Sequence, residues 1–234
     1  MSARQAVTQR LRRSLEHWPR LYTAYVQRRN TSFTPLRPNT ALVISGFGSS
    51  GNSYLRAATL AANPGIEIAS HAHNRTEVAL AVRRRLPTVF VAREPLQSVA
   101  SVLARYAPVA TANYVLEEYA RLYEHSRRLR DGFLLVDFAA ATGDVGGVIR
   151  RVNERFGTSF VPFRDDDAAA VQEVTATMRG LDADTLGERA SLTGSSPSAE
   201  RNQHKAVMIE ELNRPELASL LARCRAAYTA LISP

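Results

Sequence analysis

The stretch that decides the fold is residues 40–56, which read TALVISGFGSSGNSYLR. It begins with a short apolar run that has no polar alternation, a pattern typical of a buried parallel strand. A loop of small residues follows at 46–51, and a helical pattern runs over 52–62. A strand, a glycine-rich loop and a helix start together form a cradle for phosphate. The N–H groups of the loop and the positive end of the helix point at the anion.

The two outer glycines of this loop, Gly46 and Gly51, have the spacing of a P-loop, and Ser53 occupies the Ser/Thr position of that motif. The lysine of the motif is absent, and Asn52 stands in its place. A glycine turn that only joins a strand to a helix gives the same pattern. The loop by itself therefore leaves both interpretations open.

Short apolar runs alternate with helical patterns after this loop. Further strands are predicted at 66–70, 87–92 and 133–137, and helices at 76–86, from 95 onward, and at 113–130, 144–156, 165–178, 199–212 and 215–232. Strands that alternate with helices form βαβ units, which build a parallel sheet covered on both faces. We therefore predict an α/β fold, a three-layer sandwich of the P-loop NTPase type with about four to five parallel strands flanked by helices.

Length and composition fit one such domain. The chain has 234 residues, of which 45% are apolar and 22% charged, as in ordinary globular proteins. We predict a basic helical preamble over 1–39 and a single α/β domain over 40–234 with a helical C-terminal third. No stretch approaches the ~20 apolar residues that span a bilayer, and no secretory signal is visible. The single cysteine, Cys224, suits a reducing compartment, so we expect a cytoplasmic protein.

The formal net charge of +8 suits an anionic partner such as a nucleotide, a glycan or an acidic lipid surface. The cations are 29 arginines and one lysine, and alanine is abundant, which is typical of a bacterial, GC-rich genome. Only arginines in defined positions therefore inform on function. No basic strip interleaved with aromatic residues is present, so we expect no specific nucleic-acid partner. The basic preamble leaves open a peripheral contact with the inner face of the membrane.

A second motif follows the predicted strand 87–92. Arg93 comes directly after this strand, Pro95 suits the first turn of a helix, and Ser101 lies two helical turns on. The planar fork of arginine binds phosphate in a bidentate way, and a serine hydroxyl adds a donor.

Together these features resemble the P-loop sulfotransferases that use 3′-phosphoadenosine-5′-phosphosulfate (PAPS). The segment SSGNSYL at 49–55 is similar to the 5′-phosphosulfate loop of that family, and VFVAREPLQSVAS at 89–101 is similar to its 3′-phosphate motif. The second segment is the more specific, because residue types, spacing and the strand-to-helix context agree. The resemblance covers roughly residues 41–156.

The resemblance implies transfer of a sulfuryl group from PAPS to a hydroxyl or amine of an acceptor, which is a small molecule, a glycan or a lipid. PAP would be the product, and no metal is expected. The residues that the resemblance assigns to the cofactor are Ser49, Ser50, Gly51, Asn52, Ser53, Tyr54, Arg93 and Ser101. The family also has a basic C-terminal cofactor segment, for which Arg189, Arg201 and Lys205 are candidates.

Many members of the family place a catalytic base where His71 lies, after the strand between the two motifs. An imidazole with a pKa near 6.5 suits proton transfer at neutral pH. His73, two residues on, is the second candidate. Ser49 is counted with them because it occupies the loop position where many members carry a basic residue that helps to neutralise the leaving phosphate. Arg56 and Arg75 are candidates to supply that charge.

Two alternatives stay open. The segment 133–137 has the form of a Walker B strand that ends in a metal-binding acid, Asp137, which would suit a P-loop kinase or NTPase with a degenerate Walker A loop. The missing loop lysine opposes this interpretation, and an acid at a strand end is also a common structural feature. The second alternative is a non-catalytic module that binds nucleotides or polyanions, and the missing loop cation favours it.

Overall fold

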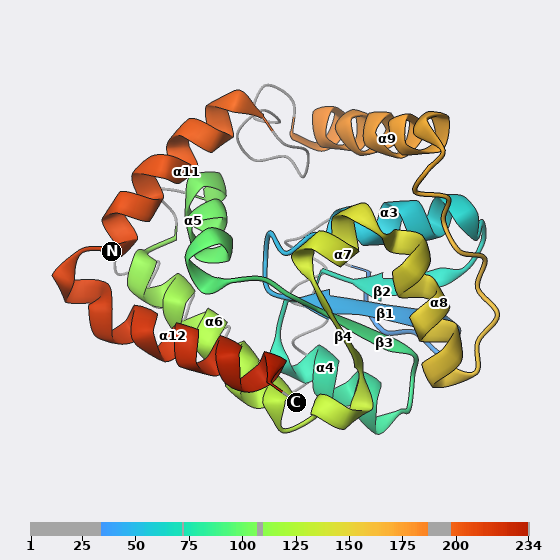
Figure 1. The fold of residues 1–234 in the computed structure, drawn as a ribbon, viewed down its shortest axis with the longest axis horizontal. Coiled ribbons are helices and arrows are strands. Elements are labelled where there is room, and N and C mark those ends of the chain that lie inside the picture. The colour runs from blue at the N-terminus through green and yellow to red at the C-terminus, as the bar shows by residue number, and fades with distance from the viewer. Residues whose placement is uncertain (1–33, 72, 107–109, 187–197, 234) are drawn as a thin grey trace.

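A computed structural model gives the fold, and the residues that it describes are 34–71, 73–106, 110–186 and 198–233. Four parallel strands form the sheet in the order β2-β1-β3-β4: β1 (Thr40–Gly46), β2 (Glu67–Ser70), β3 (Thr88–Ala92) and β4 (Leu134–Asp137). The α/β class and the parallel sheet predicted from the sequence are confirmed (Figure 1). Residues 1–33 of the helical preamble predicted over 1–39 lie outside the described residues.

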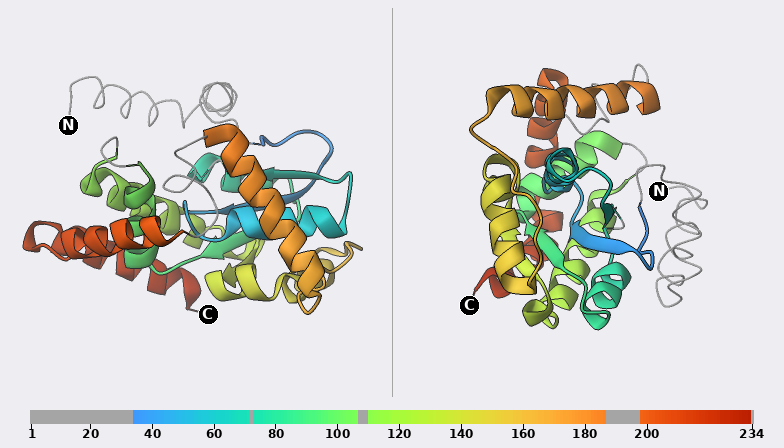
Figure 2. Two further views of the ribbon diagram at one scale, coloured as in Figure 1. Left: turned by 90° about the horizontal axis from the view of Figure 1, so that it is seen from above. Right: turned by 90° about the vertical axis from the view of Figure 1, so that its right-hand side faces the viewer.

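Helices cover both faces of the sheet, as predicted (Figures 1 and 2). One layer contains α3 (Asn52–Ala62), α7 (Phe138–Gly143), α8 (Val145–Phe156) and α9 (Ala168–Leu186). The other contains α4 (Arg75–Arg83), α5 (Pro95–Tyr106), α6 (Ala112–Arg127) and α12 (Ala218–Ile232). α11 (Ala199–Leu212) packs along α5. None of the helices in the described ranges is both long enough and apolar enough to cross a bilayer.

Side chains of the central strand β3 pack alternately against the helical layers on the two faces of the sheet. Phe90 and Ala92 belong to an apolar cluster with α5, α6 and α12. Val89 and Val91 belong to a second cluster with α3, α8 and α9. Successive side chains of a strand point to opposite faces, so an unbroken apolar run is what a strand between two helical layers requires.

The order of the strands places the two predicted phosphate motifs side by side. The chain goes from β1 to β2 on one side and then returns to β3 on the other side of β1. In open α/β sheets, ligands bind at such a reversal, outside the carboxyl ends of the strands. The loop 46–51 follows β1 and Arg93 follows β3, so both leave the same edge of the sheet from neighbouring strands.

The structure differs from the predicted elements mainly around β4 and in the C-terminal part. The short helix α7 follows β4 directly, because the Asp137 side chain accepts a hydrogen bond of 2.7 Å from Ala140 N–H and caps the helix. The helix predicted at 165–178 begins later and runs further, as Ala168–Leu186. The helix predicted at 215–232 is divided into a 3₁₀ turn, η3 (Pro215–Leu217), and α12. A second 3₁₀ turn, η1 (Arg130–Gly132), precedes β4.

Candidate functional site

The loop 46–51 depends on its glycines for its shape. Gly46 has a φ of +147°, and a Cβ at this position would lie 2.4 Å from the carbonyl oxygen of Val91 on β3. Gly51 has a φ of +88° and precedes the first residue of α3. No side chain caps α3, so the first N–H groups of this helix remain the donors that the helix itself cannot satisfy. Such an end is suited to bind an anion.

The polar side chains of the loop turn toward the protein. Asn52 is buried, and its amide nitrogen donates to the carbonyl oxygen of Phe47 at 3.2 Å. The hydroxyl of Ser50 is also buried and lies 3.4 Å from the hydroxyl of Ser98, which donates to Gly48 O at 2.9 Å. Two of the side chains predicted to bind the cofactor therefore stabilise the loop, and its backbone N–H groups are left to contact a ligand.

Arg93 connects the two predicted motifs. Its guanidinium donates a hydrogen bond to the carbonyl oxygen of Ser49 and lies 3.8 Å above the centre of the Phe138 ring. Burial lowers the pKa of this guanidinium. Ser49 itself has a left-handed backbone with a φ of 60°, a conformation that is uncommon outside glycine and concentrates at functional sites. The side chain of Arg93 thus contacts Ser49, the loop residue at whose position the resemblance expected a basic residue.

Further cations lie close to Arg93, and we refer to Arg93, Arg105, Arg201 and Lys205 as the cation group. Burial lowers the pKa of Arg201, and the charges of Arg105 and Arg93 lower it further, whereas Asp182 opposes them. Burial likewise lowers the pKa of Lys205, with added effects of Arg93 and Arg201 and opposition from Glu94.

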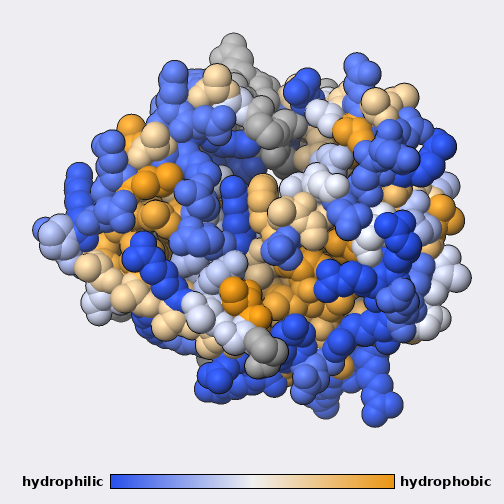
Figure 3. Space-filling model, in the orientation of Figure 1, coloured by the Kyte–Doolittle hydropathy of each residue, from blue (hydrophilic) through white to orange (hydrophobic). Residues whose placement is uncertain are grey.

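The cation group comes from the end of β3, from α5 and from α11. Figure 3 shows a hydrophilic, recessed surface between the region over α5 and α11 and the region over α7 and α3. Like charges that are held together and partly desolvated disfavour one another. A bound anion would relieve this repulsion, so the arrangement is suited to bind one.

Ser101 lies on α5 with two of these neighbours. Ser98, Ser101 and Arg105 follow one another at spacings of three and four residues on α5, so they share one face of the helix. Ser98 holds the loop and Arg105 belongs to the cation group. The face that carries the predicted hydroxyl donor is therefore the one that turns toward the site.

His71 is enclosed by serines. Its Nε2 lies 2.9 Å from the hydroxyl of Ser53 and its Nδ1 lies 2.8 Å from the hydroxyl of Ser70. Burial, followed by the charges of His73, Arg56 and Arg105, lowers the pKa of His71 to about 3. The ring is therefore neutral at physiological pH, and both of its nitrogens are engaged within the protein.

His73 has the hydrogen-bonding arrangement that is common for a base. Its Nδ1 lies 2.9 Å from the carbonyl oxygen of Gly46. A carbonyl oxygen only accepts, so Nδ1 carries a proton in this contact. The rings of His71 and His73 lie edge to face with their centres 5.6 Å apart. The contact with Gly46 O orients the ring of His73, which therefore stays a candidate for the base beside His71.

The remaining candidates are placed less centrally. Tyr54 packs against the apolar cluster of α3 and α8, and its pKa is raised by burial and by Asp165. Arg189 lies outside the described residues. Burial lowers the pKa of Arg56, opposed by Glu67, and its Nε has no hydrogen-bond partner in the described part of the chain. Arg75 begins α4. Sequence reasoning missed Ser98 and Arg105, although their helical spacing from Ser101 could have suggested both.

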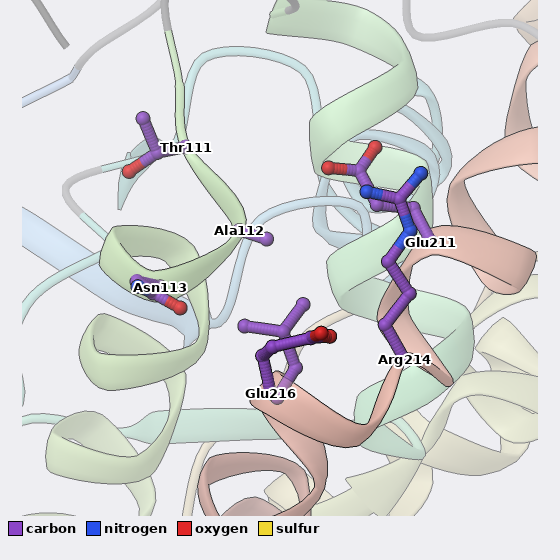
Figure 4. Close-up of a pocket in the computed structure, with 7 residues that line it drawn as sticks. Thr111, Ala112, Asn113, Glu211, Arg214 and Glu216 are labelled. Atoms are coloured by element: carbon purple, nitrogen blue, oxygen red, sulfur yellow. The ribbon is translucent and has the colours of Figure 1, made fainter.

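A second hollow, of about 300 Å³, lies where α6 begins, against the end of α11 and η3. Its lining residues are Thr111, Ala112, Asn113, Glu211, Arg214, Glu216 and Leu217. In Figure 4 the side chains of Glu211 and Arg214 lie next to each other on one side of the hollow. It contains no residue of the loop 46–51 and none of the cation group. Within the described ranges, no cluster of three His, Cys, Asp or Glu residues is arranged to hold a metal ion.

The site consists of an uncapped helix end, a loop fixed by buried serines, a group of four cations and a pair of histidines. No protein-family model and no curated protein match this chain.

Proposed function

We propose that this chain is a PAPS-dependent sulfotransferase that transfers a sulfuryl group to a hydroxyl or amine. The observation that carries the proposal is the contact of the Arg93 guanidinium with the carbonyl of Ser49, together with the two cations of α11 beside Arg93. The loop 46–51 and Arg93, to which the resemblance assigns the 5′- and the 3′-phosphate, therefore lie next to each other. One nucleotide with phosphates at both ends of its ribose could then contact both.

The residues present suit such a ligand. The N–H groups at the start of α3 would receive the 5′-phosphate, and Arg93 with Ser101 would receive the 3′-phosphate. PAPS supplies an activated sulfuryl group when bound. Lys205 and Arg201, half-buried on α11, would provide the positive charge that the loop lacks, because no basic side chain stands within 46–51.

One of the two histidines, His71 or His73, would accept the proton that the acceptor hydroxyl or amine loses. Gly46 O accepts a hydrogen bond from Nδ1 of His73 and so fixes the orientation of that ring. Burial first, and then the charges of His73, Arg56 and Arg105, lowers the pKa of His71 to about 3. An anion bound beside Arg56 and Arg105 would offset only the contributions of these two charges to the lowered pKa. Ser53 would then link the loop to that ring through its hydroxyl.

Differential scanning fluorimetry with PAP, AMP, ADP and ATP tests the cofactor class. We expect PAP to raise the melting temperature more than the other three nucleotides at equal concentration, because only PAP has a 3′-phosphate for Arg93. A ligand that binds only the native state stabilises it by RT ln(1 + c/Kd), where c is the free ligand concentration, so tighter binding gives a larger rise in melting temperature. Stabilisation by ATP equal to or above that by PAP would reject the proposal.

A non-catalytic PAP-binding module is the second candidate, and the hydrogen bonds of His71 favour it, since both ring nitrogens are already engaged. Release of PAP from PAPS, with water or an acceptor panel receiving the sulfuryl group, separates the two. Against the kinase alternative, the loop lysine is absent and Asp137 accepts a hydrogen bond from Ala140 N–H as the cap of α7. A cytoplasmic location remains part of the proposal, since Cys224 is a buried free thiol that suits a reducing compartment.

A further inference from the structure

Two tyrosines on α6 lie beneath the site. Tyr119 and Tyr123 are one helical turn apart, and both are fully buried. Their rings are stacked, with centres 4.1 Å apart and planes 14° from parallel. Burial first of all raises the pKa of both phenols, that of Tyr123 to about 12, so both keep their protons throughout the physiological range. We refer to them as the tyrosine pair.

The tyrosine pair holds the backbone of Arg93. The hydroxyl of Tyr119 donates to Arg93 O at 2.6 Å. The hydroxyl of Tyr123 accepts from Arg93 N–H at 3.0 Å and lies 3.3 Å from Arg93 O. At Arg93 the chain has left β3 and has not yet entered α5. Both backbone polar groups of Arg93 therefore depend on phenols from another element, where strand or helix hydrogen bonds would otherwise satisfy them.

The same pair contacts the loop after β1. The ring of Phe47 lies edge-on to Tyr119, with centres 5.0 Å apart. The hydroxyl of Ser50 forms a hydrogen bond with Tyr123, which partly offsets the effect of burial on the pKa of that phenol. The tyrosine pair thus touches the loop 46–51 and Arg93 at once. From the other side it is supported by α12, whose Tyr228 ring lies 6.1 Å from that of Tyr123.

We infer that Tyr119 and Tyr123 are positioning residues that set the spacing between the loop 46–51 and the Arg93 guanidinium, and thereby select a ligand with two phosphate groups over one with a single phosphate. Only the identity of the ligand rests on the proposed function. A backbone shift at Arg93 moves the base of its side chain and therefore its guanidinium. Sub-ångström placement of this kind decides whether two anionic groups can be bound together.

The test uses Tyr119→Phe and Tyr123→Phe in the full chain, because phenylalanine keeps the stacked ring and removes only the hydroxyl. Tyr106→Phe is the matched control, since Tyr106 is 50% exposed at the end of α5. Calorimetric titration with PAP, 5′-AMP and inorganic pyrophosphate gives the affinities. For the Tyr123 variant we expect an about tenfold loss of PAP affinity and less than a twofold change for 5′-AMP. The control should match the wild type.

A purely structural role would lower the melting temperature and weaken both nucleotides equally, and that result would overturn the inference. So would unchanged PAP affinity in both variants. If the wild type fails to prefer PAP, the proposed function fails, but the inference still predicts weaker pyrophosphate binding in Tyr123→Phe than in Tyr106→Phe. Should a variant fold poorly, hydrogen exchange at the Arg93 amide decides. We expect at least tenfold faster exchange in Tyr123→Phe relative to neighbouring amides, and an unchanged rate would contradict the role.

Discussion

The loop 46–51 and the cation group differ in how each would hold an anion. The loop is a local structure, made by consecutive residues, and it offers backbone N–H groups without a charged side chain. The cation group is assembled from the end of β3, from α5 and from α11, which are distant in sequence. In an ordinary P-loop one lysine supplies the charge inside the motif. Here shape and charge are supplied by separate parts of the chain.

The comparison implies that anion binding by the loop depends on the conformation of its backbone, which its glycines and the buried side chains of Ser50 and Asn52 hold in place. Binding by the cation group should depend instead on the charge of its side chains. The following experiments test this difference.

The largest effect is expected for Gly46→Ala. The new Cβ would meet the carbonyl oxygen of Val91 at 2.4 Å in a conformation with a φ of +147°, so we expect unfolding free energy to fall by about 3 kcal/mol or more. Gly65→Ala is the control, because Gly65 also has a positive φ of +87° but nothing within 4 Å of the new Cβ. It should lose only about 1 kcal/mol. Urea denaturation measures both, and equal losses would contradict a packed β1–β3 junction.

The next effect concerns turnover and the histidine pair. Alanine at the histidine that acts as the base should lower turnover about 10²-fold and leave PAP affinity nearly unchanged. The sequence favours His71, and His73, whose ring the contact with Gly46 O orients, is the second candidate. Steady-state kinetics of His71→Ala and His73→Ala decide between them. Wild-type turnover in both variants would remove the pair from the chemistry.

A pH effect is expected from His71. In the unfolded chain its imidazole takes up a proton below the ordinary pKa of 6.5, while the folded ring stays neutral down to about 3. The unfolded state therefore binds more protons as the pH falls, and stability is lost over that window. Between pH 7.5 and 5 this amounts to about 2 kcal/mol. His71→Asn should lose less stability than the wild type on acidification, whereas His204→Gln, an exposed position on α11, should behave like the wild type. Parallel losses in all three proteins would contradict a neutral His71.

The smallest effect is expected for the cations of α11. Lys205→Gln should weaken PAP binding by about 1 kcal/mol, or roughly fivefold, and the loss should shrink at high salt. The ligand-free protein should be as stable as the wild type or slightly more so, because one like charge is removed from beside Arg93 and Arg201. Arg225→Gln, exposed on α12, is the control for total charge. A Lys205 variant that destabilises the free protein without affecting PAP would show a structural role.

The loop 46–51 was predictable from the sequence, whereas the cation group, which the fold assembles from distant segments, was predictable only in part. The glycines, Ser53 and the helix 52–62 lie within one stretch, so spacing alone identified them. Arg93 was predicted from its place directly after an apolar strand and from the similarity of residues 89–101 to a 3′-phosphate motif. Ser98 was missed because its role depends on the loop 48–50, which the fold brings to it. The tyrosine pair has the spacing of ordinary core residues, and nothing in its pattern indicates a contact with Arg93.

Two predicted cofactor-binding residues show that membership of a motif does not determine where a side chain points. Asn52 and Tyr54 lie within the loop motif, yet Asn52 turns to Phe47 O and Tyr54 packs into the apolar layer of α3. A helix turns by about 100° per residue, so neighbours in a motif cannot all face the same ligand. The helix α7 was not predicted because six residues give too little periodicity, and its cap, Asp137, was interpreted as a strand-end acid.

The central claim is that one ligand contacts the loop 46–51 and Arg93 together. Calorimetric titration of the wild type and Arg93→Ala with PAP and 5′-AMP tests it most directly, with exposed Arg84→Ala as the control. We expect the wild type to prefer PAP, and we expect Arg93→Ala to lose about 1.5–3 kcal/mol of PAP binding while 5′-AMP binding changes little. Equal affinity of the wild type for the two nucleotides, or an unchanged preference for PAP in Arg93→Ala, would contradict the claim.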